Sequence, residues 1–212
     1  MAQLSKFGVP GGEMPVLMPK LGYRFRVKFL GFAGEVIPAL GTLTSQVVSV
    51  GRPSLQTETT TIDVYNSKIK LAGKSTWQDI NLVVRDDISN TVARVISAQM
   101  GRQMDHAGQS SATAGTNYKF GMVIQTLDGG NDTVQVLDTW SLAGCWLTSV
   151  NYNEMNYGTS DAVTISMTIA YDNADYHIGD MPESSLPGLL GDLGGGPALR
   201  ALSAGDTATN PN

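Results

Sequence analysis

The triplet Gly73-Lys74-Ser75 could contact phosphate, because it matches the end of the loop in which backbone N–H groups and a lysine cradle nucleotide phosphates. The complete motif also needs an earlier glycine, at position 68, and a helix directly after the serine. Position 68 is a lysine, and the residues after Ser75 alternate between polar and apolar as a strand does. The sequence therefore predicts a hairpin turn here, with Gly73 supplying the backbone freedom, and no nucleotide site.

Side chains that bind metals or act as nucleophiles are few and scattered. The single cysteine, Cys145, lies in an apolar alternating segment, where a buried inert thiol is the usual outcome. His106 and His177 have no second ligand at a zinc spacing. The acidic residues after the last predicted strand do not have the spacing of a calcium loop; they are Asp172, Asp175 and Asp180.

Three tryptophans could form a platform for a sugar ring: Trp77, Trp140 and Trp146. Tryptophans that alternate along a strand more often belong to the core, although a carbohydrate-binding module stays open as an alternative. No pattern of a catalytic triad, metal centre or cofactor site is present. The sequence therefore predicts a protein that is not an enzyme and has no cofactor.

The composition indicates a protein made mainly of β-strands. The chain has 212 residues, of which 16% are charged, below the average of about 25% for soluble proteins. Serine, threonine, valine and isoleucine are abundant. A single cysteine excludes a disulfide within the chain. We see no hydrophobic signal region and no stretch of membrane-spanning length, and we expect synthesis in the cytoplasm.

The charge is distributed unevenly along the chain. Residues 1–119 carry 13 basic and 8 acidic side chains, whereas residues 120–212 carry 1 basic and 11 acidic side chains. The net charge of the whole chain is −5. Chance produces such asymmetry, but so does a subunit whose basic surface meets the acidic surface of its own copy. The sequence leaves both interpretations open.

The alternation of apolar and polar residues, together with the turn-forming residues between segments, predicts about eight strands and one helix. They are arranged as an antiparallel β-sandwich or barrel with one flanking helix. The predicted strands cover residues 23–29, 43–50, 62–71, 80–84, 118–126, 133–138, 140–150 and 163–171. The helix, at about 88–105, follows possible capping carboxylates at Asp86 and Asp87. Its apolar side consists of Ile88, Val92, Val95, Ile96, Met100 and Met104.

Composition divides the chain into three parts. Residues 1–20 form a predicted Gly/Pro-rich arm, residues 21–180 the β domain, and residues 181–212 a flexible tail rich in Gly, Pro and Ala.

Three segments together resemble the tail tube protein of contractile-tailed bacteriophages, a family related to the Hcp tubes of type VI secretion. Tyr23–Phe29 is similar to the family's opening strand, and Tyr65–Leu82 is similar to its hairpin with a small-Gly-basic-x-Thr-aromatic turn. Leu142–Tyr152 and Val163–Tyr171 are similar to its paired closing strands. The resemblance covers roughly residues 22–176.

The resemblance implies a structural virion protein of the phage tail. Subunits would form hexameric rings whose strands join into one inner β-barrel, and the rings would stack into a helical polymer that conducts DNA during ejection. The implied partners are other copies of the chain, the tail sheath protein, and baseplate or terminator proteins at the ends, with DNA only as passing cargo. A hub or baseplate component, or a secretion-system tube of the same fold, remains an alternative.

The segment Leu55–Tyr65 is prone to form a strand, yet it is polar on both faces and lacks an apolar side to hold it to its own core. Such a ribbon is either a mobile loop or an arm ordered by a partner. We therefore predict that it packs across the interface between rings, together with nearby charged residues. The candidate assembly residues are Arg52, Gln56, Thr57, Glu58, Thr59, Thr60, Thr61, Asp63, Tyr65, Lys68 and Lys70.

Overall fold

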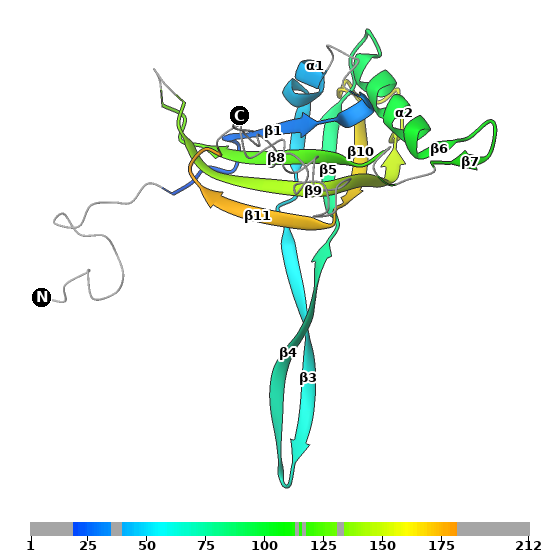
Figure 1. Cartoon of the computed structure of the whole chain (residues 1–212). Coiled ribbons are helices and arrows are strands. Elements are labelled where there is room, and N and C mark those ends of the chain that lie inside the picture. Colours follow the sequence, from blue (N-terminus) through cyan, green and yellow to red (C-terminus); the bar gives the residue numbers. More distant parts are fainter. Residues whose placement is uncertain (1–18, 35–39, 113–114, 116–117, 131–133, 182–212) are drawn as a thin grey trace, which may run out of the picture.

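The computed structural model describes residues 19–34, 40–112, 115, 118–130 and 134–181. Two α-helices lie on one side of an antiparallel sheet, and a long two-stranded hairpin leaves on the other side (Figure 1). The helical elements are η2 (Phe32–Gly34), α1 (Leu40–Ser45) and α2 (Thr91–Gln103). The strands are β1 (Phe25–Leu30), β2 (Val47–Val50), β3 (Ser54–Val64), β4 (Ser67–Gln78), β5 (Ile80–Arg85), β6 (Met104–Asp105), β7 (Ser110–Ser111), β8 (Phe120–Leu127), β9 (Val136–Asn151), β10 (Thr164–Ala170) and β11 (Asn173–Ile178).

The main sheet has the strand order β1-β8-β9-β10-β5-β2, and β11 also pairs with β9. The 16-residue strand β9 joins two halves of the sheet, because residues 138–143 pair with β11 and residues 146–151 pair with β10. The prediction of a mainly β, antiparallel fold with a flanking helix is confirmed. Within the described residues the sheet does not close into a barrel, because β1 and β2 remain its two ends.

The core lies between the sheet and the helices. On α2 the side chains of Val92, Val95 and Ile96 are fully buried, at the spacing that the sequence predicts. On the sheet, Phe29 and Phe120 meet the ring of Phe32, with the rings of Phe32 and Phe120 edge to face at 4.7 Å between centroids. Burying each such side chain stabilises the fold by about 1.5–3 kcal/mol.

Helix α2 begins later than predicted, at Thr91 instead of residue 88. Ile88 is fully exposed and lies in the turn before the helix, so its predicted place in the core is wrong. The capping prediction is confirmed for Asp87, whose Oδ1 accepts hydrogen bonds from the backbone N–H groups of Val92 and Thr91 at 3.0 and 2.8 Å. These bonds, that of Val92 above all, lower the pKa of Asp87.

The structure differs from the prediction in two further places. The strand predicted over residues 43–50 begins as helix α1, in which Leu43 is fully buried, and only β2 is extended. Local bonds from the N–H of Gln46 to the carbonyls of Thr42 and Leu43 close the helical turn. A second difference lies after helix α2, where the small β6–β7 hairpin is not among the predicted strands.

The two strands predicted over 133–138 and 140–150 are the single strand β9. Its pairing shifts near Gly144, because Phe120 lies opposite Cys145 whereas Met122 lies opposite Leu142. The extra residue on β9 is a β-bulge, and Gly144 has a positive φ of 67°. The bulge exchanges the two faces of the strand, so Leu142 is buried before it and Cys145 after it.

This exchange moves Trp146 off the side of β9 that faces the core, so its predicted place in the core is wrong. Trp140 lies before the bulge on the same side as Leu142, and it is half-buried and packs against the core. Strand β11 was not predicted. It lies at an edge of the sheet and carries mostly exposed side chains, so it has no apolar periodicity that could reveal it.

The predicted arm at residues 1–20 and the tail at residues 181–212 lie outside the described residues, except for residues 19, 20 and 181.

Candidate assembly surface

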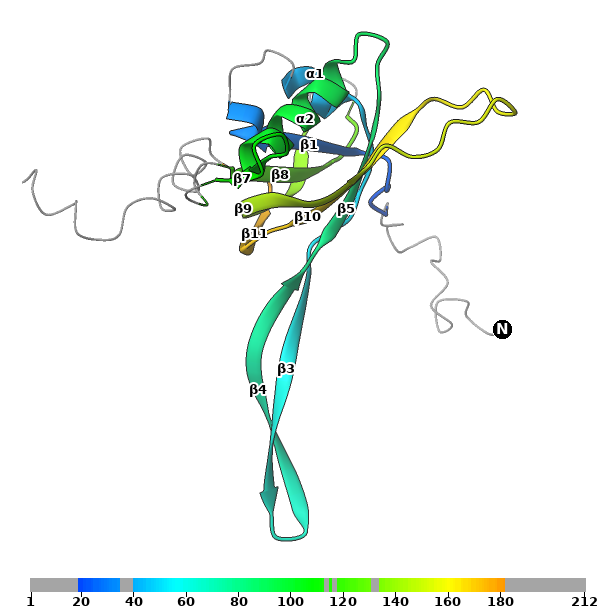
Figure 2. The same cartoon turned by 90° about the vertical axis from the view of Figure 1, so that its right-hand side faces the viewer.

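The hairpin of β3 and β4 extends away from the rest of the molecule (Figures 1 and 2). Every residue of β3 is exposed. The chain reverses at Tyr65 and Asn66, where Tyr65 has a φ of 46° and is wholly exposed. The turn predicted at Gly73 is therefore wrong. Gly73 lies in the middle of β4, next to Glu58 of β3, so the triplet Gly73-Lys74-Ser75 belongs to a strand.

All the candidate assembly residues lie on this hairpin or at its base, and all are exposed. Residues 56–61 and Asp63 belong to β3, Tyr65 forms the tip, and Lys68 and Lys70 belong to β4. Arg52 precedes β3 at the base. The structure thus brings the predicted residues together on one projecting element, and their contact with another subunit stays a prediction.

The end of β4 is attached to the body through Trp77. Its indole Nε1 donates a hydrogen bond to Asn173 Oδ1 at 3.2 Å. Its ring lies 5.8 Å from that of Tyr171, centroid to centroid. Just before β3, the N–H of Gly51 donates to the carbonyl of Asn81 at 2.8 Å. The base of the hairpin is therefore held on both strands.

Asp138 of β9 is a second point of attachment. Its buried carboxylate bonds to the Lys20 ammonium and lies 3.8 Å from an Arg52 guanidinium nitrogen. Burial alone would raise the pKa of Asp138, but the hydrogen bonds from Lys20 and Thr126 and the charges of Lys20 and Arg52 outweigh burial and lower it. The carboxylate is therefore ionised and holds the chain before β1 near the base of the hairpin.

A bulge divides the hairpin into a proximal and a distal half. Thr57 pairs with Ser75 and Thr59 pairs with Ala72, so β4 has one extra residue opposite Glu58. A Cβ on Gly73 would lie 3.1 Å from the carbonyl oxygen of Glu58, which is tighter than side chains usually allow. The bulge decides which side chains of β4 share a face with those of β3.

In the distal half, one face of the hairpin is apolar. Ile62 pairs with Ile69, and Thr60 pairs with Leu71. We call the four exposed aliphatic residues of this face the distal apolar strip: Ile62, Val64, Ile69 and Leu71, each 43–49% exposed. The prediction that the ribbon lacks an apolar face holds for residues 55–61 taken alone, but it is wrong for the hairpin, because β4 supplies half of the strip.

The opposite face of the distal half is polar. Thr61 pairs with Lys70, and Asp63 pairs with Lys68, whose ammonium lies 3.4 Å from the carboxylate. The sequence reasoning missed the strip because it placed the turn at Gly73. With the turn at Tyr65, the alternation of Ile62 and Val64 would have revealed it.

One more exposed aliphatic residue, Leu55, lies in the proximal half of the hairpin and pairs with Trp77. An isolated two-stranded hairpin with exposed aliphatic side chains is at best marginally stable in water. Covering its apolar surface against another molecule would stabilise it by about 25 cal/mol per Å². The hairpin therefore has apolar surface that contact with another molecule would cover.

Among the described residues, Cys145 and the possible metal ligands form no recognisable chemical site. Cys145 is buried, and burial raises the pKa of its thiol. No group of three or more His, Cys, Asp or Glu side chains in the described part of the chain could hold a metal ion. Two of the tryptophans pack on different tyrosines: Trp77 on Tyr171 and Trp140 on Tyr176, with 4.9 Å between the latter ring centroids. None of the described helices has the length and apolarity needed to span a membrane.

Comparison with solved structures shows which proteins share this architecture. A chain of the sheath/tube terminator of an extracellular contractile injection system (PVC, extended state) superposes with a TM-score of 0.56 at 18% identity, covering 77% of this chain and 99% of that one. The anti-feeding prophage tube-terminating cap gives a TM-score of 0.56 at 15% identity, and the match covers 80% of this chain and 98% of that one. A chain of the PVC sheath-tube complex gives a TM-score of 0.52 at 19% identity, and the match covers 84% of this chain and 99% of that one.

The chain shares its fold with these three proteins. The likeness extends over nearly the full length of the compared chains, and it is a likeness of fold, since fewer than one residue in five is identical. No family model matches the sequence, and no curated protein matches it. Within this fold, every residue of β3 and most residues of β4 are exposed.

Proposed function

We propose that this protein is a structural component of a contractile tail, in which copies form hexameric rings that stack into the inner tube. The exposed β3–β4 hairpin carries the proposal, because it projects from a fold shared with the compared terminator, cap and sheath-tube chains and presents the distal apolar strip to solvent. A neighbouring copy in the next ring would cover the strip. Identical subunits that associate head to tail close into rings or continue as filaments, and stacked rings give a polymer.

The unpaired edges of the main sheet also favour association between copies. Strands β1, β2 and β11 each have a partner on one side only within the described residues. Exposed edges invite disordered aggregation, and pairing between subunits removes them. We propose that such pairing joins the sheets of neighbouring copies into one ring-wide barrel.

A tail role implies further partners. The sheath protein would surround the tube, and baseplate or terminator proteins would cap its ends in the virion tail, after synthesis in the host bacterial cytoplasm. DNA would pass through as cargo. The net charge of −5 favours this role, because a conduit rich in lysine and arginine would hold phosphates instead of letting them slide.

Electron microscopy of the purified protein tests the proposal. We expect hexameric rings and tubes for the full chain. In a matched variant an Asn-Gly turn replaces residues 60–71, which removes the distal half but joins Thr59 and Ala72, already a cross-strand pair. We expect this variant to fold as judged by circular dichroism, yet to form no long tubes. A full chain that stays monomeric at high concentration would refute the proposed function.

A tube terminator is a second candidate. The terminator and the terminating cap both superpose with a TM-score of 0.56, against 0.52 for the sheath-tube complex. A terminator would form single rings that bind the end of a tube but do not stack on one another. The same micrographs therefore separate the two candidates: tubes indicate a tube subunit, and isolated rings indicate a terminator.

A further inference from the structure

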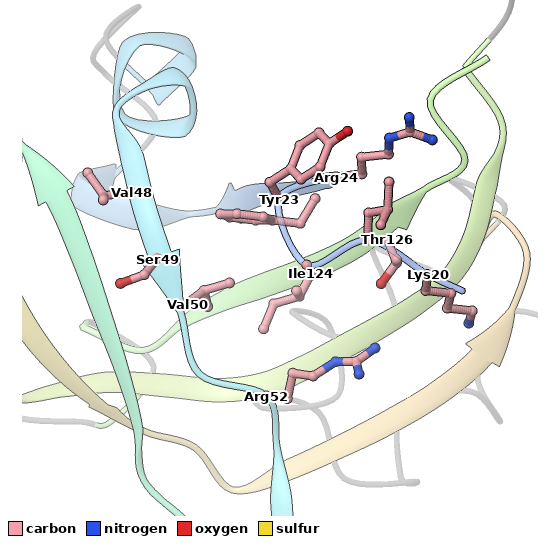
Figure 3. A pocket seen from close by; sticks show the side chains of 12 residues that line it. Lys20, Tyr23, Arg24, Val48, Ser49, Val50, Arg52, Ile124 and Thr126 are labelled. Atoms are coloured by element: carbon pink, nitrogen blue, oxygen red, sulfur yellow. The ribbon is translucent and has the colours of Figure 1, made fainter. Parts of the chain in front are cut away.

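A groove runs between β1 and β2, the two ends of the main sheet (Figure 3). A cavity of about 470 Å³ lies between the chain around the start of β1, strand β2 and strand β8. A second cavity of about 520 Å³ adjoins it and shares Tyr23, Phe25 and Val48. We call the two cavities together the β1–β2 groove. Its lining includes the half-buried Phe25 and Val50 and the buried Ile124, so it is partly apolar.

The β1–β2 groove is strongly basic. Five cationic side chains line it: Lys20, Arg24, Arg26, Arg52 and Arg85. Among the described residues Asp138 is the single carboxylate within 4 Å of any of them, and it contacts Lys20 and Arg52. Arg24 donates to the backbone carbonyl of Asp128 and also attracts the Asp128 carboxylate, whereas Arg26 donates to the neutral side-chain oxygen of Gln125. Five cations thus face two carboxylates, Asp128 and Asp138. The groove therefore has an excess of positive charge.

The loop between β9 and β10 has the complementary character. Every residue from Tyr152 to Val163 is exposed, and Met155 and Tyr157 are 80% and 111% exposed. Glu154 and Asp161 are its charged residues, so it is acidic. The loop projects from the body, in yellow in Figure 2, and a hollow of about 460 Å³ lies between its arms.

The base of this loop is held in place. Asn153 has a φ of 53°, and its Nδ2 donates to the carbonyl and the Oγ1 of Thr164, both at 2.9 Å. The loop thus has a fixed origin, yet two of its large side chains, Met155 and Tyr157, are left in solvent. Large apolar and aromatic side chains in such a position are typical of interface anchors.

We infer that the acidic loop at residues 152–163 of one copy docks in the β1–β2 groove of a neighbouring copy. This inference rests on the proposed function and names the contact through which copies would meet. Met155 and Tyr157 lie against the apolar lining, and Glu154 and Asp161 face the groove cations. Each copy carries both halves of the contact, so the association is head to tail.

The other projecting element is the β3–β4 hairpin, and its charge does not suit the β1–β2 groove. The β3–β4 hairpin carries three basic residues, Lys68, Lys70 and Lys74, against two acidic ones, Glu58 and Asp63. A hairpin with a net positive charge would be repelled by a basic groove, whereas the loop is attracted to it. The apolar lining of the groove also favours a protein segment over a phosphate backbone.

A labelled peptide with the sequence of residues 152–163 tests the contact directly. The binding partner is the full-length loop variant Glu154→Lys/Asp161→Lys, because its native groove is not filled by the loop of a neighbouring copy. The groove and hairpin changes below are made in this variant. We expect binding that weakens with added salt. The groove variant Arg24→Glu/Arg52→Glu should lose at least about tenfold in affinity, since it places like charges against the loop. The hairpin variant Lys68→Glu/Lys70→Glu has the same change in net charge and should bind the peptide as the loop variant does.

The peptide itself provides tests that leave the protein intact, so a groove variant that does not fold causes no ambiguity. Peptides with Glu154→Lys/Asp161→Lys or with Met155→Ala/Tyr157→Ala should bind at least about tenfold more weakly than the parent peptide. Equal binding of all peptides, or no binding of the parent peptide, would overturn the inference.

Two other occupants would be revealed by the same assay. If a short DNA duplex binds the parent protein but not the groove variant, while the peptide binds neither, the groove is a nucleic-acid site and the inference is wrong. If the peptide binds only a variant that lacks residues 1–18, the chain's own N-terminal segment occupies the groove, and the inference is also wrong.

Mixing of full-length variants separates this inference from the proposed function. The loop variant Glu154→Lys/Asp161→Lys and the groove variant should each fail to assemble alone. Their equimolar mixture should assemble, because native loops then meet native grooves and the reversed charges also match. Rings that form unchanged in both variants would overturn the docking contact and leave the tube proposal standing. A monomeric parent protein that still binds the peptide would refute the tube proposal and support the contact.

Discussion

The indole nitrogen of Trp77 and the side-chain oxygen of Asn173 lie 3.2 Å apart, and their hydrogen bond joins the end of β4 to the start of β11. The long hairpin is thereby oriented by an edge strand of the body. Rigid placement matters for a docking element, since a mobile arm loses entropy when a partner orders it.

Replacing Trp77 with Phe should loosen this attachment while it keeps the ring contact with Tyr171. We expect a loss of about 0.5–1.5 kcal/mol in the free energy of unfolding, the typical contribution of one hydrogen bond. Amide exchange in β3 and β4 should accelerate. Trp140→Phe is the control, because Trp140 also packs on a tyrosine ring and lies outside the hairpin. Unchanged exchange in the Trp77 variant would show that other contacts orient the hairpin.

The distal apolar strip should matter for assembly and not for folding. Ile62→Thr/Ile69→Thr keeps a β-branched pair on the same face. The free energy of unfolding of the isolated subunit should change by no more than about 0.5 kcal/mol per site, because both side chains are half exposed. Sedimentation velocity should show fewer large assemblies. The matched control, Ile88→Thr/Val134→Thr, alters two exposed aliphatic residues outside the hairpin and should assemble normally. Equal loss in both variants would show that the strip has no special role.

Asp138 should make stability depend on pH. Because its pKa is lowered in the folded state, its ionised form stabilises the fold above the unfolded pKa of about 3.9, and that contribution disappears as pH falls through the folded pKa. The parent should exceed Asp138→Asn by about 1–3 kcal/mol near neutral pH, as expected for bonds to charged groups. The difference should shrink in acid. The exposed Asp63→Asn change should stay within about 0.5 kcal/mol at every pH. A difference that grows in acid would contradict the assignment.

Gly144 should tolerate no side chain. Its φ of 67° strains any other residue, and a Cβ would lie 2.1 Å from Asp172 Oδ2. We expect Gly144→Ala to lower the free energy of unfolding by about 1–3 kcal/mol, measured by urea denaturation. Gly101→Ala is the control, because nothing lies within 4 Å of that position and it belongs to helix α2. A neutral Gly144 variant would mean that the bulge can move along β9.

The sequence predicts the apolar elements of this fold well. Periodicity locates β1, β10 and the buried side of α2 because each of them packs one regular face against the core. Periodicity fails where a bulge breaks the alternation, as at Gly144 in β9 and opposite Glu58 in β4. It also fails for β11, since an edge strand gains its stability from backbone pairing and needs no apolar face.

The role of the candidate assembly residues stays a prediction. The structure places the threonine-rich ribbon on the projecting hairpin, and Arg52, Lys68 and Lys70 lie on or beside it. The distal apolar strip was missed because a glycine between two alternating segments resembles a turn, whereas the true turn at Tyr65 and Asn66 has no glycine. The β1–β2 groove could not be predicted, because it is formed by strands that are neighbours only after the sheet has curved.

The length of β3 has a consequence for how an assembly would grow. Leu55 and Val64 are both exposed and lie nine residues apart on β3, which separates them by about 30 Å along an extended strand. One small contact cannot cover both ends of the hairpin. A copy that joins a short stack would gain part of its contacts at once and the rest only when further copies arrive. Polymerisation would then show a lag, a concentration threshold and rapid elongation, and the cell could hold many separate subunits until a template starts growth.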